Sequence, residues 1–262
     1  MSAVTSETIP DIQGLVDTRR IAIDAVGIKG LRHPVVIQEA DGTTQSTIAT
    51  CTFTVNLPHD RKGTHMSRFV ALLGDAPRVI SPAALAALHR EMLELLDADF
   101  GTIEMNFPYF VRKVAPKSGV SSLMDYGARL TATGDRCTTH VTMGVEVPVT
   151  SLCPCSKEIS QYGAHNQRSH IRAEVECDPT LGLTELIQLL EAQASCELFG
   201  LLKRADEKYI TERAYENPKF VEDMIRDVAH ALGEEPRIHG FSVEVENFES
   251  IHNHSAYARL SR

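Results

Sequence analysis

The chain has 262 residues, of which 43% are hydrophobic and 23% are charged, which is typical of globular proteins and excludes a disordered or fibrous chain. Its formal net charge of -9 provides no general field that would attract nucleic acid or an anionic membrane. This length is enough for one large domain or for two domains of roughly 130 residues.

The N-terminal residues 1–14 contain neither a basic start nor an apolar core, so we expect no secretion signal and no membrane span. The expected location is the cytoplasm. Six cysteines without a tight framework of spacings indicate reduced thiols rather than disulfides. A cysteine with a functional role is therefore expected to take part in catalysis or to bind a metal.

The first 45 residues carry several turn formers and no sustained period, so we interpret residues 1–45 as an N-terminal arm. Residues 47–58 alternate in polarity and are rich in Thr and Val, which predicts a half-buried strand that ends at Pro58. Residues 66–74 are predicted to be its partner strand.

The clearest predicted helix begins at Ser81, because a serine N-cap followed by proline at the first helical position is a typical helix start. It carries one apolar stripe: Leu85, Leu88, Met92 and Leu95. Residues 101–116 and 121–134 follow as two predicted strands. The first half therefore has the order strand, strand, helix, strand, strand.

The second half shows the same order of elements. Its predicted strands and helices are strands 137–149 and 169–177, helices 183–202 and 217–232, and strands 238–248 and 254–262. A short motif, G-x-H-x-x-R, occurs at 63–68 and again at 163–168. We infer an α+β duplication, with a first module at 46–134 and a second at 135–262.

Two antiparallel four-stranded sheets, each with helices on one face, leave edge strands that need to be covered. Several copies that join edge to edge close into a barrel and remove these edges. We therefore expect an oligomer with sites between its subunits.

Two thiols stand two positions apart at Cys153 and Cys155. This spacing is shorter than that of redox enzymes, and we expect the intervening Pro154 to prevent a helix whose dipole would activate a thiol. A structural zinc site has four cysteine or histidine ligands, and the sequence has no second cysteine pair with matching spacing to complete one. The two thiols therefore remain candidates for a catalytic nucleophile or for ligands of an open catalytic metal site.

An open metal site needs about three protein ligands and a vacant position. The nearest imidazole is His165, and the segment 249–254 adds Glu249, His252 and His254. Glu207 and Glu222 lie on charged segments, where a solvated helix face is the simpler interpretation. A cysteine can likewise be a small core side chain rather than a ligand.

Three segments, 147–171, 206–232 and 246–258, resemble the type IB GTP cyclohydrolase I family of prokaryotes. The resemblance implies the tunnelling fold, with two modules per chain, and a homotetramer. It also implies metal-dependent hydrolysis of GTP to formate and 7,8-dihydroneopterin triphosphate, the first step of tetrahydrofolate biosynthesis.

The matching motifs imply a role for each residue. The metal-site residues are Cys153, His165, Glu207, Glu249 and His252, with Cys153 and His165 also the expected catalytic residues. Glu222 resembles the carboxylate that anchors the guanine ring. Thiolate, imidazole and carboxylate donors together suit Zn²⁺, and also accommodate Mn²⁺ or Fe²⁺.

Basic side chains have to hold the triphosphate, and we expect Arg168, Lys113 and Arg61 to do so. Two rival functions remain open. The same fold houses the nitrile reductase of queuosine synthesis, in which a thiol like Cys153 attacks a nitrile and NADPH supplies hydride. A purine-binding or zinc-storage module would bind GTP or metal without turnover.

Overall fold

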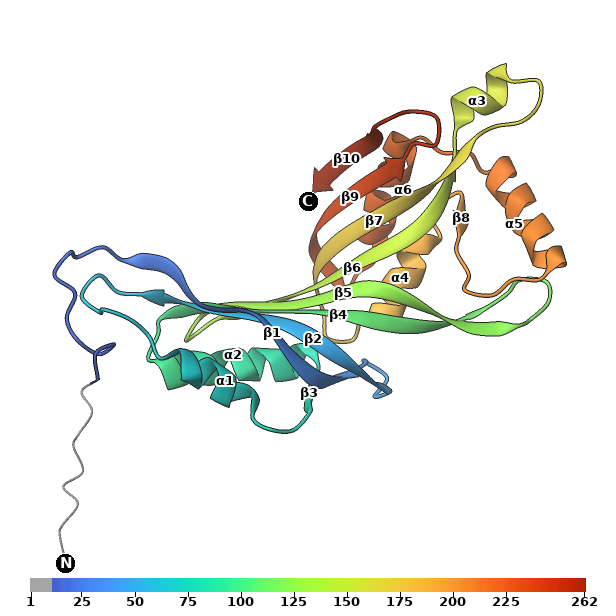
Figure 1. The fold of residues 1–262 in the computed structure, drawn as a ribbon. Helices are drawn as coiled ribbons and strands as arrows, with labels where there is room; N and C mark the ends of the chain where they lie inside the picture. The colour runs from blue at the N-terminus through green and yellow to red at the C-terminus, as the bar shows by residue number, and fades with distance from the viewer. Residues whose placement is uncertain (1–10) are drawn as a thin grey trace, which may run out of the picture.

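The computed structural model describes residues 11–262, so residues 1–10 of the expected arm lie outside the described range. One sheet runs through this range and carries helices on one side (Figure 1); its strands pair antiparallel except β3, which pairs parallel with β1. Its strands follow the order β10-β9-β7-β6-β5-β4-β2-β1-β3, and β8 pairs with β6. The architecture is α+β.

The strands are β1 (Ile23–Gln38), β2 (Thr44–Leu57), β3 (Arg78–Ile80), β4 (Phe100–Val114), β5 (Ser121–Asp135), β6 (Thr139–Leu152), β7 (Asn166–Cys177), β8 (Cys196–Glu197), β9 (Ile238–Phe248) and β10 (Ser255–Ser261). The helices are α1 (Met66–Leu73), α2 (Pro82–Leu96), α3 (Pro154–Ile159), α4 (Leu183–Glu191), α5 (Arg204–Glu216) and α6 (Val221–Glu234).

The expected arm contains a strand that the sequence analysis missed. β1 pairs antiparallel with β2, and the register shifts between Lys29 and Leu31. Gly30, with φ of 79°, sits at this irregularity. Because the shift moves the following side chains to the opposite face, the alternation of polarity is broken within the strand.

The predicted partner strand at 66–74 is wrong, because these residues form α1. Its buried side chains are Phe69, Leu72 and Leu73, while Val70 is exposed. This spacing of three and four residues fits one helix face. The prediction of α2 is confirmed, since the Ser81 hydroxyl accepts a hydrogen bond from the backbone N–H of Ala84 at 3.2 Å.

Two predicted helices of the second half have different bounds in the structure. The helix predicted at 183–202 ends at Glu191, and β8 follows it. The charged segment around Glu207 forms the helix α5, in agreement with the helix face expected there. α6 begins at Val221, and Gly233 lies inside it rather than ending it.

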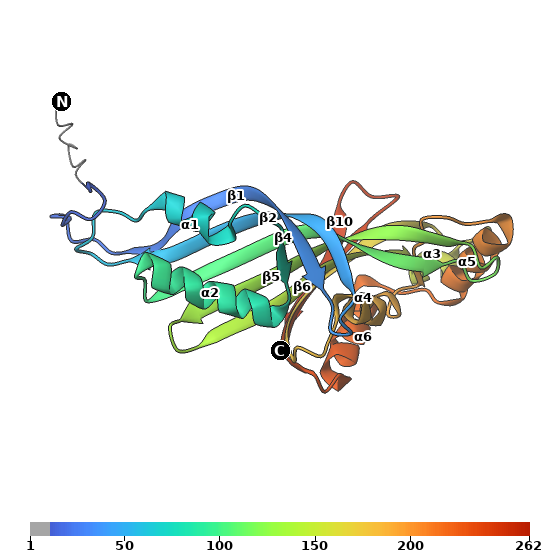
Figure 2. The same cartoon turned by 90° about the horizontal axis from the view of Figure 1, so that it is seen from below.

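Each half contributes four long strands in chain order, with helices between the second and third. β5 and β6 pair with each other, so the halves share one continuous sheet. Figure 2 shows α1 and α2 lying across the strands of the first half, with α4 and α6 at the second. The buried apolar side chains of both halves form one connected core. The division into modules at 46–134 and 135–262 stays a prediction.

Within residues 11–262, none of the helices is long and apolar enough to span a membrane.

Candidate functional site

The two thiols lie where β6 ends and the short helix α3 begins. Cys153 is the N-cap of α3, and its Sγ lies 3.5 Å from the backbone N of Ser156, which donates to it. Pro154 occupies the first helical position, so the expectation that it prevents a helix is wrong. Proline is tolerated there because its missing N–H would have no partner in the first turn.

The loop after α3 brings His165 back to the end of β6, next to Cys153. The backbone N–H of Cys153 donates to the carbonyl of His165 at 3.2 Å, just before β7 pairs with β6 through Leu152 and Asn166. Eleven residues of chain separate Cys153 from His165, and the sheet register brings the two residues together.

Polar side chains replace apolar ones where β6, β7 and β9 reach this end of the sheet. Ser151, Ser169 and Asn247 are buried on the side that the helices cover. The hydroxyls of Ser151 and Ser169 lie 2.7 Å apart. Because side chains alternate along a strand, residues two positions further on share this face. This alternation places Cys153 and Glu249 beside the buried polar group.

His165 and Glu249 are linked through Gln167. The Nδ1 atom of His165 lies 2.9 Å from Oε1 of Gln167, and the Gln167 amide donates to Oε1 of Glu249 at 3.4 Å. The hydroxyl of Ser250 also lies 3.1 Å from His165 Nδ1. Gln167 is only 8% exposed. The sequence analysis did not single out Gln167, although its position two residues after His165 in a strand was a usable signal.

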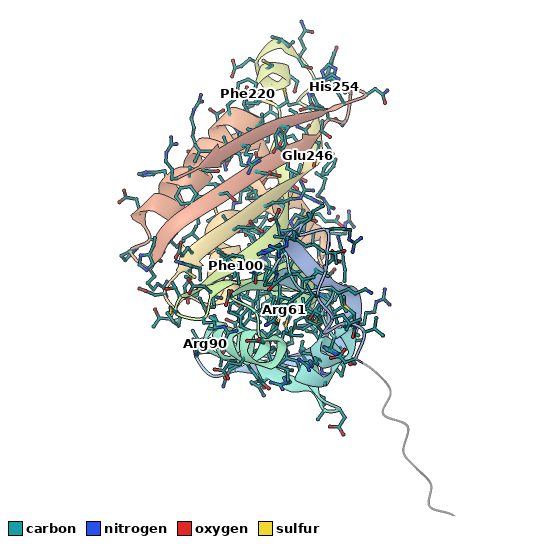
Figure 3. All side chains as sticks on the ribbon, turned by 90° about the vertical axis from the view of Figure 1, so that its left-hand side faces the viewer. Arg61, Arg90, Phe100, Phe220, Glu246 and His254 are labelled. Atoms are coloured by element: carbon teal, nitrogen blue, oxygen red, sulfur yellow. The ribbon has the colours of Figure 1, made fainter. Side chains whose placement is uncertain are left out.

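The turn between β9 and β10 brings the remaining imidazoles to this end of the molecule. The rings of His252 and His254 stack with centroids 5.2 Å apart, and both side chains are exposed. Figure 3 shows His254 at the tip of this turn, at the end of the molecule that carries α3.

Glu207 is exposed in the first turn of α5. Its neighbour Asp206 fixes this turn, because the fully buried carboxylate accepts hydrogen bonds from the backbone N–H groups of Lys117, Ser118 and Lys203. Burial raises the pKa of Asp206, but these hydrogen bonds and that from the Ser118 hydroxyl outweigh burial and hold it below its ordinary value. The turn between β4 and β5 therefore sets the place of Glu207.

Glu222 is exposed in the first turn of α6. The segment that leads to it is fixed to the thiol loop, since the backbone N–H of Lys219 donates to the carbonyl of Leu152 at 3.1 Å. Asn217 also donates to the carbonyl of Ala194 at 2.9 Å. The expected guanine anchor is therefore connected to the strand end that carries Cys153.

The donor types present fit a divalent metal, because a thiol, imidazoles and carboxylates are all ligands of Zn²⁺ or Mn²⁺. Across residues 11–262, however, no three such side chains lie close enough to hold an ion. The described chain joins His165 to Glu249 through Gln167 and to Cys153 through the backbone. It does not bring Glu207 or His252 into this group.

The three basic residues expected to hold a triphosphate lie apart. Arg168 is exposed on β7, on the face opposite Gln167. Lys113 is largely buried and pairs with the buried Glu191 at 2.5 Å. Arg61 lies in the connection between β2 and α1 and pairs with Asp97. Figures 1 and 2 show this connection at the end of the molecule opposite α3.

A hollow of about 730 Å³ lies on the helix-free face of the sheet, and none of the candidate residues lines it. Six of its charged side chains form ion pairs between strands, among them Glu244 with Arg259 at 3.6 Å. Arg129 pairs with Glu174 at 2.9 Å, and Arg172 pairs with Glu146 at 2.5 Å. These pairs account for most of the charges in the hollow without a ligand.

Several solved structures share the fold of this chain. The uricase from Arthrobacter globiformis has a TM-score of 0.56 at 10% identity, covering 91% of this chain and 92% of the other. A urate oxidase from Bacillus sp. TB-90 has a TM-score of 0.53 at 6% identity, covering 92% and 99%. At such identities the likeness shows the fold alone, and it agrees with the expected tunnelling fold.

Similarity in sequence is far higher to a group of enzymes. "GTP cyclohydrolase FolE2 2" of Dechloromonas aromatica (strain RCB) is 57% identical over 262 residues, covering 99% of this chain and 96% of the relative. "GTP cyclohydrolase FolE2" of Azoarcus sp. (strain BH72) is 54% identical over 265 residues, covering 100% and 98%. These relatives do not support the nitrile reductase alternative. The sequence model "Type I GTP cyclohydrolase folE2" matches residues 9–258, and the chain therefore belongs to this family.

Proposed function

We propose that this chain is a GTP cyclohydrolase that converts GTP and water to formate and 7,8-dihydroneopterin triphosphate. The family match over residues 9–258 carries the proposal. The contacts that join Cys153, His165 and Glu249 support it.

The metal site is proposed to consist of Cys153, His165, Glu207, Glu249 and His252. These residues would hold a divalent ion, Zn²⁺ or Mn²⁺ with Fe²⁺ as a further option, and such an ion would supply hydroxide near neutral pH by lowering the pKa of bound water to about 7. Opening the imidazole ring of the purine at C8 needs such a nucleophile.

The residues of the chain supply binding and proton transfer. The imidazole of His165 is proposed to protonate the departing ring nitrogen, and general acid–base steps of this kind contribute about 10²- to 10⁴-fold in rate. The carboxylate of Glu222 can accept two parallel hydrogen bonds, from N1–H and the 2-amino group of guanine. Adenine lacks this pair of donors, so the desolvated carboxylate rejects it.

Arg168 is proposed to contact the triphosphate from its exposed position on β7. Lys113 and Arg61 belong to the same proposal, but each already has an acidic partner in the chain. A triphosphate has to compete with Glu191 for Lys113 and with Asp97 for Arg61.

A homotetramer is proposed to complete the site. The sheet ends in open strands at β10 and at β3, and edge-to-edge joining of copies satisfies their backbone groups. Assembly also explains how Arg61, which lies far from Cys153 in one chain, can serve a site at the α3 end of another copy.

A formate assay tests the proposed activity. Purified protein is loaded with Zn²⁺ or Mn²⁺ and incubated with GTP, with ATP as the control nucleotide, and formate and the pterin product are quantified. We expect formate from GTP only, and loss of turnover after treatment with a chelator. Metal-loaded protein that yields no formate contradicts the proposal, as does full activity in a chelator-stripped preparation.

A further inference from the structure

We infer that Gln167 is a positioning residue of this site, whose side-chain amide selects one tautomer of His165 and orients the carboxylate of Glu249. The effect on turnover rests on the proposed function, whereas the tautomer and the contact with Glu249 are properties of the chain alone.

The position of Gln167 in the sheet makes its amide rigid. It lies in β7 on the side that the helices cover and is only 8% exposed. The next residue on that face, Ser169, is fully buried and bonded to Ser151. A buried amide has to satisfy its donors and its acceptor within the protein. The contacts of Gln167 are 2.9 Å to His165 Nδ1 and 3.4 Å to Glu249 Oε1.

The chemistry of the three groups determines which atom carries each hydrogen. An ionised carboxylate only accepts hydrogen bonds, so the NH₂ group of Gln167 has to face Glu249. The amide oxygen therefore faces His165. Since this oxygen also only accepts, Nδ1 of His165 has to carry the proton. In the neutral ring this leaves the lone pair on Nε2, which is the nitrogen left to bind a metal or exchange a proton.

Ser250 cannot make the same selection. Its hydroxyl lies 3.1 Å from His165 Nδ1, but a hydroxyl both donates and accepts, so it is compatible with either tautomer. Ser250 is also exposed. Of these two described neighbours of Nδ1, Gln167 is the one that gives the ring a fixed direction, because a carboxylate holds it on its other side. Groups that orient a metal-binding histidine in this way typically change metal affinity about 10- to 100-fold when removed.

Two variants separate the contacts of Gln167. Gln167→Leu removes both of them, whereas Gln167→Glu keeps an acceptor facing His165 and loses the donor to Glu249. Gln45→Leu is the matched control, because Gln45 also donates and accepts through its amide, with the backbone of Phe110, in the first half.

The first measurement uses metal-free protein and no GTP. The ¹⁵N chemical shifts of the His165 ring at alkaline pH should show the Nδ1–H tautomer in the wild type, in Gln167→Glu and in Gln45→Leu. Gln167→Leu should show a mixture of tautomers. Zinc affinity, measured by competition with a chromophoric chelator, should fall about 10- to 100-fold in Gln167→Leu and stay unchanged in Gln45→Leu.

Turnover is then compared in metal-saturated protein. We expect kcat of Gln167→Leu to fall while KM for GTP stays near the wild-type value, because the guanine contact is elsewhere. A wild-type ring protonated on Nε2, or a Gln167→Leu protein with wild-type tautomer and zinc affinity, overturns the inference. If Gln167→Leu does not fold, the wild-type and Gln167→Glu spectra still decide it. If the wild type releases no formate, the proposed function fails while the spectra continue to test the role of Gln167.

Discussion

Lys219 donates its backbone N–H to the carbonyl of Leu152 at 3.1 Å, which ties the start of α6 to the residue that precedes Cys153. Glu222, in the first turn of α6, is thereby placed in a fixed relation to the thiol loop. In the proposed reaction these two elements have different tasks, because one holds the guanine ring and the other holds the metal. This backbone hydrogen bond fixes the position of the proposed guanine anchor relative to the proposed metal site.

The proposed guanine contact predicts a loss of base selection in Glu222→Gln. We expect kcat/KM for GTP to fall by the equivalent of about 1–3 kcal/mol, because an amide cannot accept both hydrogen bonds from the guanine edge. Steady-state kinetics with GTP measure this effect. Glu234→Gln, at the exposed end of the same helix, is the control and should behave as the wild type. An unchanged preference for GTP over ATP in Glu222→Gln would contradict the anchoring role.

The two thiols are expected to differ in function. Cys153→Ser should give folded protein without product, because a hydroxyl is a far weaker metal ligand than a thiolate. His165→Ala should lose about 10²- to 10⁴-fold in rate. Cys155→Ser, at an exposed position in α3, should retain turnover. Formate release and metal content of the three proteins are the measurements, and full activity in Cys153→Ser and His165→Ala would refute the site assignment.

Lys113 is expected to matter for stability more than for substrate affinity. Its ammonium group and the carboxylate of Glu191 are both buried, and Tyr126 donates to the same carboxylate at 2.6 Å. Lys113→Met leaves a buried charge without its partner, which typically costs about 3–5 kcal/mol. Urea unfolding should show this loss and its recovery in the double variant with Glu191→Met. Lys208→Met, at an exposed ion pair, is the control. A raised KM for GTP in Lys113→Met without loss of stability would instead support a triphosphate role for Lys113.

Asp206 is expected to hold α5 against the turn between β4 and β5. In Asp206→Asn an NH₂ group replaces one of the two acceptor oxygens, each of which accepts two hydrogen bonds, so two of the donors from Lys117, Ser118 and Lys203 lose their partner and the turn is held less firmly. Amide hydrogen exchange at Lys117 and Ser118 should become faster, and the melting temperature should fall. Asp223→Asn, which loses a capping contact at the exposed start of α6, should leave exchange at Lys117 unchanged. Unaltered exchange in Asp206→Asn would show that the turn is held by other contacts.

Glu39 is expected to make stability depend on pH. Burial raises its pKa above the ordinary 4.5, while the backbone N–H of Leu183, which donates to it at 3.0 Å, offsets part of the rise. A raised carboxyl pKa means that the folded state holds the proton more tightly, so this contribution to stability is fully present below about pH 4.5 and is lost as the pH rises through the folded pKa. The free energy of unfolding of Glu39→Gln, relative to that of the wild type, should therefore rise as the pH increases from about 4.5 through the folded pKa of Glu39. Urea titrations across this range measure the difference, and parallel pH profiles would rule out the effect.

Local sequence patterns were sufficient for elements whose periodicity is uninterrupted. The alternation in β4 and β5 and the N-cap of α2 at Ser81 are set by neighbouring residues, and both predictions are confirmed. The pattern failed where tertiary pairing overrides local order. β1 contains Gly30 at a register shift, and its pairing with β2 continues the strand on both sides of this shift.

The sequence by itself determined the chemical inventory of this protein: the thiol pair, the histidines and carboxylates, and the family motifs that connect them with GTP. It could not show that Gln167 joins His165 to Glu249, that Asp206 holds α5, or that Lys113 is paired with Glu191. Those contacts link residues up to 89 positions apart. Periodicity reports which face of an element is apolar, but the distance between two faces depends on the sheet register and the packing of helices, which only the tertiary structure decides.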